Sequence, residues 1–298
     1  MGSSDVSSAQ VALITGGASG MGLGLVEKLV SQGWNITVVD FNEETGKAVA
    51  EKLGSQVYYI KGNVAKYEDQ SAAFVATYKK WGHIDLVWAN AGIGDRIDFL
   101  KPVEEDASGA PPKPDAVVID ICLYGVVYSA YLALHFFRKN PSKTGKLVMT
   151  SSMAGIYPAG SISLYGAAKH GVVGLTRSLA QGLKSRDETI TVNCLCPGLV
   201  PTALPGQAIL DAFPKNRLTP ISTIVRAVEE FIADDSITGQ AAECSGEEIH
   251  YRPVPTYSDE NAEYLAGGKF AEEIKIDRDA MLHNSIASRK KLDELLSD

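Results

Sequence analysis

The sequence predicts an α/β fold, with a single doubly wound parallel sheet and helices on both of its faces. Three observations indicate this fold. Short apolar runs alternate with helical patterns, the runs are apolar at nearly every position, and a Gly-rich segment (residues 15–22) joins the first run to the first helical pattern. Runs without polar alternation are typical of strands that helices cover on both faces. One continuous pattern over 298 residues favours a single domain.

The predicted elements follow one another at the spacing of βαβ units, in which a helix connects two parallel strands. The predicted strands span residues 11–15, 35–40, 57–61, 84–89, 146–150, 189–195 and 240–244. The predicted helices span residues 21–32, 43–53, 70–81, 116–138, 164–185 and 221–233.

The folded domain is expected to span residues 9–252, between a flexible N-terminus (1–8) and a C-terminal extension (253–298). Two segments do not fit the alternation of predicted strands and helices. Residues 93–115 are acidic and then Pro-rich, and residues 199–220 carry large apolar side chains between prolines and glycines. We expect these two loops to form the wall of a substrate site for a bulky hydrophobic small molecule, and the second to act as a mobile lid. The alternative is that their apolar residues only pack locally.

Composition excludes several classes of function. The formal net charge is −8, so the chain offers no basic surface for nucleic acid or for an anionic membrane. No apolar run reaches the roughly 18 uncharged residues of a membrane span, and the N-terminus has no secretory pattern. The four cysteines form no paired framework, and Cys194 and Cys196 lack a second ligand pair for zinc. We expect a cytoplasmic protein that binds no metal.

The Gly-rich segment, Thr-Gly-Gly-Ala-Ser-Gly-Met-Gly at residues 15–22, separates a strand from a helix. Glycines let the backbone approach a pyrophosphate there, and the helix N-terminus presents free N–H groups to it. The segment could also be no more than a tight turn. Asp40 ends the second predicted strand, where a carboxylate can bind both adenosine ribose hydroxyls and repel a 2′-phosphate. The sequence therefore favours NAD over NADP.

Tyr165 and Lys169 are four residues apart, which places both side chains on one face of a predicted helix. A nearby ammonium favours the phenolate form of a tyrosine, so that Tyr165 could exchange a proton with an alcohol or a ketone. Ser152 follows the fifth predicted strand, and its hydroxyl could hold the substrate oxygen.

Together these motifs resemble the short-chain dehydrogenase/reductase family over residues 9–250. The matching segments are 15–22, Asn90-Ala-Gly92, 151–155, 165–169 and 197–202. Asp40 and the segment 246–251 resemble the NAD-dependent hydroxyprostaglandin dehydrogenase type. The resemblance implies a Rossmann-like sheet, catalysis by Ser152, Tyr165 and Lys169, and a family role for segment 197–202 beside the nicotinamide. The implied cofactor residues are Gly16, Ser19, Gly20, Met21, Gly22, Asp40, Phe41, Asn63, Val64, Asn90, Ala91, Gly92, Tyr165, Lys169, Pro197, Gly198, Val200 and Thr202.

One position departs from the family pattern. Cys122 stands where the family usually has an Asn in the long helix, which implies an altered proton relay behind Lys169. The favoured function is NAD-dependent oxidation of a secondary alcohol, or the reverse reduction. The alternatives are a family member turned to non-redox chemistry and a non-catalytic NAD-binding protein. The resemblance also implies a homodimer whose seam includes Tyr124, Val127, Tyr131 and His135.

Overall fold

The computed structural model describes residues 9–267 and 269–270. The predicted flexible N-terminus (1–8) lies outside the described residues, as does most of the predicted C-terminal extension. The chain divides into two compact units, Met1–Pro253 and Val254–Asp298. The described part of the second unit contains one short helix, α9 (Glu260–Ala266).

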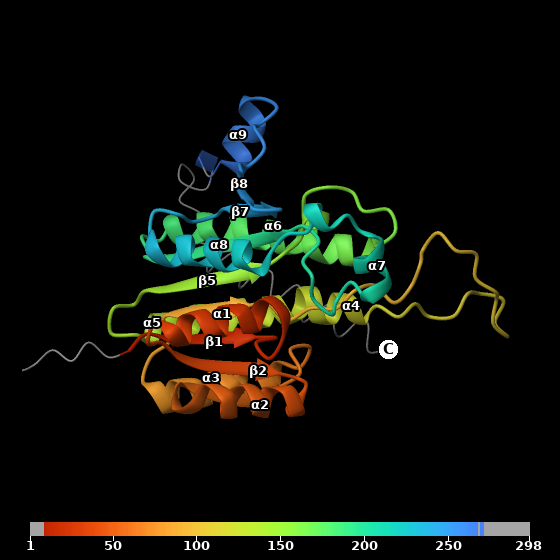
Figure 1. Ribbon diagram of the computed structural model, residues 1–298. Helices are drawn as coiled ribbons and strands as arrows, with labels where there is room; N and C mark the ends of the chain where they lie inside the picture. The colour runs from red at the N-terminus through yellow and green to blue at the C-terminus, as the bar shows by residue number, and fades with distance from the viewer. Residues whose placement is uncertain (1–8, 268, 271–298) are drawn as a thin grey trace, which may run out of the picture. The chain divides into compact units, whose positions relative to one another are not determined.

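The first unit is built on one sheet with the strand order β3-β2-β1-β4-β5-β6-β7-β8 (Figure 1). Every neighbouring pair is parallel except β7 and β8, which are antiparallel. The strands are β1 (Val11–Thr15), β2 (Asn35–Asp40), β3 (Val57–Lys61), β4 (Leu86–Ala89), β5 (Gly145–Thr150), β6 (Ile190–Pro197), β7 (Ala241–Ser245) and β8 (Glu248–Arg252).

Helices cover both faces of this sheet. On one face α1, α2 and α8 pack over one apolar core, and on the other face α3, α5 and α6 pack over a second. The helices are α1 (Gly20–Ser31), α2 (Glu43–Leu53), α3 (Tyr67–Trp81), α4 (Val117–Ile119), α5 (Gly125–Lys139), α6 (Ser163–Lys184), α7 (Gln207–Ala212) and α8 (Ile221–Ala233). The shorter turns are η1 (Gly54–Gln56), η2 (Asp120–Tyr124), η3 (Met153–Gly155) and η4 (Lys215–Arg217).

The predicted fold class is therefore confirmed. Several details differ, and three of them bear on the site and the sheet. The helix predicted over residues 116–138 contains the π-helical turn η2 between α4 and α5. The sixth strand continues to Pro197, because Cys196 and Pro197 pair with β7. The antiparallel edge strand β8 was missed, since its mostly polar and exposed residues lack the apolar run of a buried strand.

The parallel order brings the carboxyl ends of five strands to one edge of the sheet. β1 is buried at all five positions, and it lies between β2 and β4. The strands therefore deliver their last residues side by side: Thr15, Asp40, Ala89, Thr150 and Pro197. In open α/β sheets, ligands bind outside this edge at the point where the strand order reverses. That point lies here between β1 and β4.

The helical run Val117–Lys139 is long and apolar enough to cross a membrane by length and composition alone. Its position in the fold explains the composition. Val126, Ala130, Ala133 and Phe137 are buried in the core beneath the sheet. Burial on one side accounts for much of the apolar surface of this helix.

Candidate active site

The Gly-rich turn has no room for larger side chains at two of its positions. Gly16 has a φ of +65°, and a Cβ there would lie 2.9 Å from the Cα of Ala91. A Cβ on Gly22 would lie 2.1 Å from the carbonyl oxygen of Gly16. Glycine is therefore required for the turn to close against β4 and α1. This close backbone approach is the geometry of a pyrophosphate cradle.

Helix α1 begins directly after this turn. Its N-cap residue, Ser19, makes no side-chain capping hydrogen bond, and the first turn of α1 carries no acidic residue. The N–H groups and the positive end of the helix dipole thus remain available to an anion. Met21 packs against the core on this face and fixes the start of the helix. The cradle and the helix fit a dinucleotide phosphate.

Asp40, the last residue of β2, lies beside the glycine turn. Its carboxylate accepts hydrogen bonds from the N–H of Ala18, at 3.0 Å, and from the N–H of Asn42, also at 3.0 Å. Asp40 therefore connects the glycine turn to the start of α2. The next residue, Phe41, is 70% exposed and is free of the core. Its exposed ring at the end of β2 is suited to contact with a bound adenosine.

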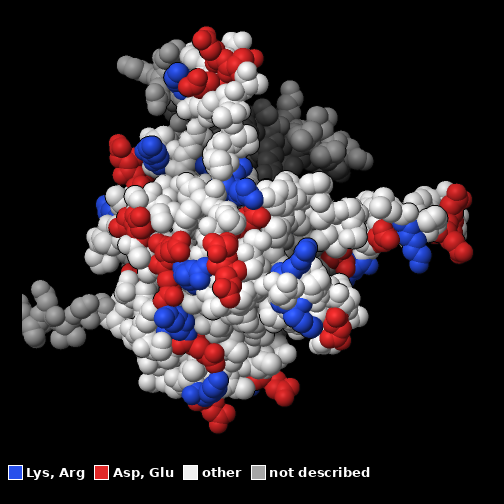
Figure 2. Space-filling view, turned by 45° about the horizontal axis from the view of Figure 1, so that its top comes forward, with Lys and Arg blue, Asp and Glu red and all other residues white. Residues whose placement is uncertain are grey.

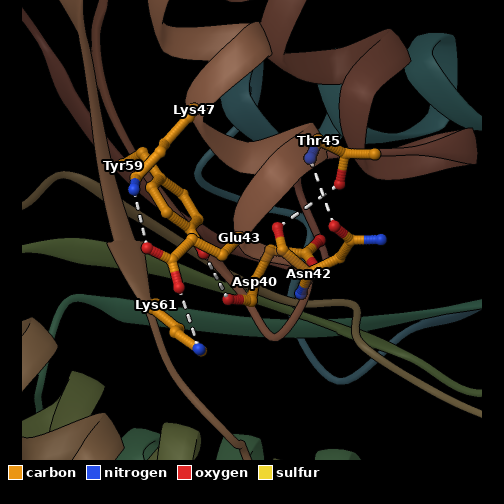
Figure 3. A network of polar contacts seen from close by, with 7 residues as sticks. All are labelled: Asp40, Asn42, Glu43, Thr45, Lys47, Tyr59 and Lys61. Carbon is orange, nitrogen blue, oxygen red and sulfur yellow. Dashed lines mark hydrogen bonds and ion pairs between the residues drawn. The ribbon is translucent and has the colours of Figure 1, made fainter.

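A charged network surrounds Asp40, as Figure 3 shows. Glu43 pairs with Lys47 at 2.7 Å and with Lys61 at 2.9 Å, and these contacts lower the pKa of its carboxyl to about 2. The Tyr59 hydroxyl donates to the backbone carbonyl of Asp40. Burial, followed by the charges of Asp40 and Glu43, raises the pKa of Tyr59. Both lysines of this network thus pair with the single carboxylate of Glu43, which offsets one of their two positive charges.

Asn90 connects β4 to the glycine turn. Its side-chain amide donates to the carbonyls of Thr15 and Gly16, each at 3.2 Å. The Thr15 hydroxyl accepts from the N–H groups of Asn90 and Ala91. The Thr150 hydroxyl donates in turn to the Asn90 amide oxygen at 3.3 Å. The carboxyl ends of β1, β4 and β5 are thereby held in one network.

Lys169 lies beneath this edge and is only 2% exposed. Its ammonium donates to the carbonyl of Thr150 at 2.7 Å and lies 5.3 Å from the centre of the Tyr165 ring. A Cβ on Gly92 would approach the Lys169 nitrogen to 3.7 Å, which places the Asn90-Ala-Gly92 turn over the ammonium. The structure therefore brings Lys169 together with Tyr165 and with the segment predicted to bind the cofactor.

Ser152 follows β5 and caps the short turn η3. Its hydroxyl oxygen accepts from the N–H of Ala154 at 3.1 Å, so the hydroxyl proton can be donated elsewhere. The preceding residue, Ser151, donates to the carbonyl of Lys169 at 2.8 Å. A Cβ on Gly155 would meet Ser151 Oγ at 2.3 Å. This close packing seats α6 on the end of β5, and so places Ser152 and Tyr165 on adjacent elements.

The segment after β6 meets the glycine turn. A Cβ on Gly20 would lie 3.0 Å from Thr202 Cγ2, so these two predicted cofactor residues are neighbours. Gly198 donates its N–H to the carbonyl of Cys244, and Pro197 ends β6 at the edge of the sheet. Val200 is buried in the core, and its carbonyl accepts from the N–H of Thr202. The segment 197–202 therefore closes the site opposite α1.

Asn63 and Val64 follow β3. The Asn63 side-chain oxygen accepts from the N–H of Ala65, and its backbone N–H donates to Asp69. Val64 is buried against Gly125, at the start of α5. The Asn63 side chain thus fixes its own turn, and Val64 fixes the packing of that turn on α5.

Tyr157 is a second tyrosine near the end of β5. Its hydroxyl donates to the buried Glu243 at 3.0 Å, and this hydrogen bond raises the pKa of Tyr157. Arg252 donates both to Glu243 and to the Tyr157 hydroxyl. Because its phenolate is disfavoured, Tyr157 is poorly suited to proton exchange, in contrast to a tyrosine beside an ammonium.

The cysteines have no metal-site geometry. All four are buried, and the described residues contain no group of three His, Cys, Asp or Glu side chains that could hold a metal ion. The hydrogen bond that Cys196 donates to Cys194 raises the pKa of Cys196, as burial also does, and lowers the pKa of Cys194. Burial raises the pKa of Cys244 to about 12. All four thiols are therefore core residues, and the thiolate form is disfavoured at Cys196 and Cys244.

The surface carries mixed charge. On the face drawn in Figure 2, blue and red side chains are interspersed without a broad basic area. Several form exposed pairs, such as Lys28 with Glu229 and Lys52 with Glu27. The loop containing residues 96–115 projects from the sheet edge in Figure 1, and Phe99 and Leu100 on it are 57% and 77% exposed.

Sequence reasoning missed several residues that hold the site together. Thr15, Thr150 and Ser151 support the predicted residues through the hydrogen bonds described above. Their position at the ends of strands was a usable signal, because such residues meet at one sheet edge. Asp95 was also missed: its carboxylate accepts from the N–H groups of Leu164 and Tyr165. No local pattern connects residues so far apart in the sequence.

Comparisons with known proteins agree with this geometry. The family profile for short chain dehydrogenase matches residues 10–210. Short-chain dehydrogenase/reductase prx7 of Penicillium rubens is 36% identical over 264 residues, covering 80% of this chain and 93% of that protein. Human 15-hydroxyprostaglandin dehydrogenase (NAD(+)) is 30% identical over 201 residues, covering 65% of this chain and 70% of that protein.

A solved structure extends the likeness to three dimensions. The 3-ketoacyl-(acyl-carrier-protein) reductase of Brucella melitensis, complexed with NADH, superposes with a TM-score of 0.67 at 26% identity. The match covers 78% of this chain and 96% of that one. Fold, site geometry and sequence likeness lead to one conclusion: this chain belongs to the short-chain dehydrogenase/reductase family of oxidoreductases.

Proposed function

We propose that this protein is an NAD-dependent dehydrogenase that oxidises a secondary alcohol of a bulky hydrophobic small molecule to a ketone, or catalyses the reverse reaction. One observation carries the proposal. The buried Lys169 ammonium lies 5.3 Å from the Tyr165 ring and is fixed by the Thr150 carbonyl. A buried cation beside a tyrosine stabilises the phenolate, which is the form that accepts a proton from an alcohol.

The residues of the site divide the chemistry among them. A bound nicotinamide would accept or supply the hydride. Ser152 donates its hydroxyl proton to the substrate oxygen, since its own oxygen already accepts from Ala154. Tyr165 takes the proton from the alcohol in oxidation and returns it to the ketone in reduction. Lys169 stabilises the resulting phenolate charge and also lies close enough to the Asn90-Ala-Gly92 turn to hold the nicotinamide ribose.

NAD is proposed over NADP because of the charges at the end of β2. The Asp40 carboxylate, fixed by Ala18 and Asn42, would accept hydrogen bonds from ribose hydroxyls and repel a 2′-phosphate. Glu43 pairs with Lys47 and Lys61, the nearby cations that could attract such a phosphate, and its negative charge weakens that attraction. The human relative named above carries NAD(+) in its own name, which supports the same choice.

The two alternatives differ in what they require of the site. A non-catalytic NAD-binding protein needs only the glycine cradle and Asp40, so it gives no reason for a buried Lys169 beside Tyr165. A family member with non-redox chemistry would use the same three catalytic side chains without net hydride transfer. NADH formation in step with product formation distinguishes the proposed function from both.

The test is absorbance at 340 nm, with NAD and then NADP for a panel of hydrophobic secondary alcohols, and with NADH and then NADPH for the matching ketones. Turnover with NAD should fall by about 10²- to 10⁴-fold in Tyr165→Phe, the range expected for loss of a general acid–base. NADH binding, followed by fluorescence, should be nearly unchanged. NADH binding without turnover on any member of the panel would contradict the proposal.

We also propose a homodimer in a reducing compartment such as the cytoplasm. The outer side of η2 and α5 supports a dimer, because Tyr124, Tyr131 and His135 are exposed along it and Val127 is half-buried. Tyr128 packs between Tyr124 and the ring of Tyr67 from α3. Four buried cysteines that form no disulfide are compatible with reducing conditions.

A further inference from the structure

We propose that Asp95 is a positioning residue that holds Tyr165 in its working place and attaches the base of the loop 96–115 to it. This inference rests on the proposed function, in which Tyr165 exchanges the proton.

Asp95 caps helix α6 from a distance in the sequence. Its Oδ1 accepts from the N–H of Tyr165 at 2.7 Å, and its Oδ2 accepts from the N–H of Leu164 at 3.1 Å. Leu164 and Tyr165 are the second and third residues of α6, the positions that an N-cap side chain normally satisfies. The actual N-cap residue is Ile162, which makes no side-chain capping hydrogen bond.

This contact therefore supplies the first turn of α6 with two hydrogen-bond acceptors and with a negative charge at the positive end of the helix dipole. The shorter of the two hydrogen bonds is donated by the backbone N–H of Tyr165. The cap therefore acts directly on the residue that carries the phenol. A carboxylate that accepts hydrogen bonds from two successive N–H groups fixes both the position and the direction of the helical turn that carries the phenol.

The segment around Asp95 is itself fixed on both sides. Two residues earlier, the backbone of Ile93 is held by the Cys122 thiol in η2. On the other side, Arg96 pairs with Asp115 at 3.7 Å, which closes the base of the loop between them. Asp115 also caps α4 by accepting from the N–H of Val117 at 3.0 Å.

Residues 93–95 thus connect η2 to α6 through hydrogen bonds, and the exposed loop begins directly after them. A displacement of the loop by substrate would be transmitted through Asp95 to the first turn of α6. We therefore expect Asp95 to influence the chemical step much more than the binding of cofactor, because the residues that would hold the cofactor's phosphates and adenosine ribose lie on the glycine turn, α1 and the end of β2.

The experiment compares Asp95→Ala, which removes both acceptors, with Asp95→Asn, which keeps one amide oxygen. Asp95→Ala should lower kcat by roughly 10- to 100-fold, the cost of a small misplacement of a catalytic group, and Asp95→Asn should recover part of it. The dissociation constant for NADH should stay within about twofold of wild type in both variants, because no cofactor contact is lost.

Asp259→Ala is the matched control. It also removes an aspartate side chain that caps a helix, but the hydrogen bond it accepts, from the N–H of Ala262 at 2.8 Å, lies on α9 rather than α6. Asp259→Ala should retain most of the wild-type kcat. Wild-type kcat in Asp95→Ala, or an equal loss in Asp259→Ala, would overturn the inference, and so would a parallel loss of NADH affinity and kcat in Asp95→Ala.

Amide hydrogen exchange separates this inference from the proposed function. Exchange at Leu164 and Tyr165 should accelerate in Asp95→Ala and remain at the wild-type rate in Asp259→Ala, in protein without any substrate. If the wild-type protein shows no turnover, the proposed function fails, while accelerated exchange still supports the capping role. Unchanged exchange in Asp95→Ala would refute the capping role whatever the activity.

Discussion

The Cys122 thiol donates a hydrogen bond to the carbonyl of Ile93 and accepts one from the N–H of the same residue, each with a sulfur distance of 3.3 Å. Both the donor and the acceptor of the Cys122 thiol are therefore engaged in hydrogen bonds at this position. A side-chain amide such as that of Asn also offers both a donor and an acceptor. The thiol thus fixes the backbone after the Asn90-Ala-Gly92 turn, next to Lys169.

This relationship predicts the behaviour of two variants. Cys122→Ala removes both hydrogen bonds and leaves the half-buried N–H and carbonyl of Ile93 without these partners, at a cost of about 1 kcal/mol in the free energy of unfolding. Cys122→Asn restores a donor and an acceptor, and we expect it to retain most of the activity. Denaturant unfolding and steady-state rates measure the two effects. An Ala variant as stable as wild type would show that the thiol contacts contribute nothing.

Cofactor preference should respond to Glu43 as well as to Asp40. Glu43→Gln releases Lys47 and Lys61 from their ion pairs, and the two charges should strengthen NADP binding by about threefold at low salt. Asp40→Ser removes the repulsion of a 2′-phosphate and should change the NAD/NADP affinity ratio by roughly tenfold or more.

Fluorescence titration with both reduced cofactors measures these ratios directly. Glu44→Gln serves as the control, since Glu44 lies beside Glu43 in the first turn of α2 but has no ion pair among the described residues. An equal gain in NADP affinity in the control would mean that net charge alone, and not the Glu43 pairs, sets the preference.

The glycine cradle makes a steric prediction. Gly22→Ala would place a Cβ 2.1 Å from the Gly16 carbonyl oxygen and 2.9 Å from the Asn90 amide nitrogen. The turn must open, so we expect weaker NADH binding and a lower melting temperature. Gly174→Ala on the exposed side of α6 has open space and should be neutral or stabilise the helix by up to about 1 kcal/mol. Normal NADH affinity in Gly22→Ala would show that the cradle is not the cofactor site.

The proposed dimer depends on the exposed aromatic side of α5. Tyr131 is 68% exposed at the centre of this face, and Tyr131→Asp would place a charge in the seam. We expect the molar mass from light scattering to fall from that of two chains to that of one. Phe99→Asp, on the exposed loop, is the control and should leave the mass unchanged. A wild-type protein that is already monomeric would refute the dimer.

Much of the fold was accessible from local patterns. The strand Val11–Thr15 and the helices Glu43–Leu53 and Ile221–Ala233 were predicted with the bounds that the structure has. Their apolar periodicity is strong, because one or both faces are buried in the core. The edge strand Glu248–Arg252 and the π-helical turn η2 were not predicted, since neither leaves a periodic apolar signal.

In the candidate site, too, some features follow from local sequence and others only from the tertiary structure. The sequence alone determined the glycine turn, the strand-end carboxylate of Asp40 and the spacing of Tyr165 and Lys169, because each depends on residues close together in the chain. Only the tertiary structure decided that Asp95 caps α6, that Cys122 holds Ile93, and that Glu43 pairs with Lys61. These contacts join residues separated by 70, 29 and 18 positions. They exist because the strand order and the helix packing bring those segments to one edge of the sheet, and no local propensity encodes that proximity.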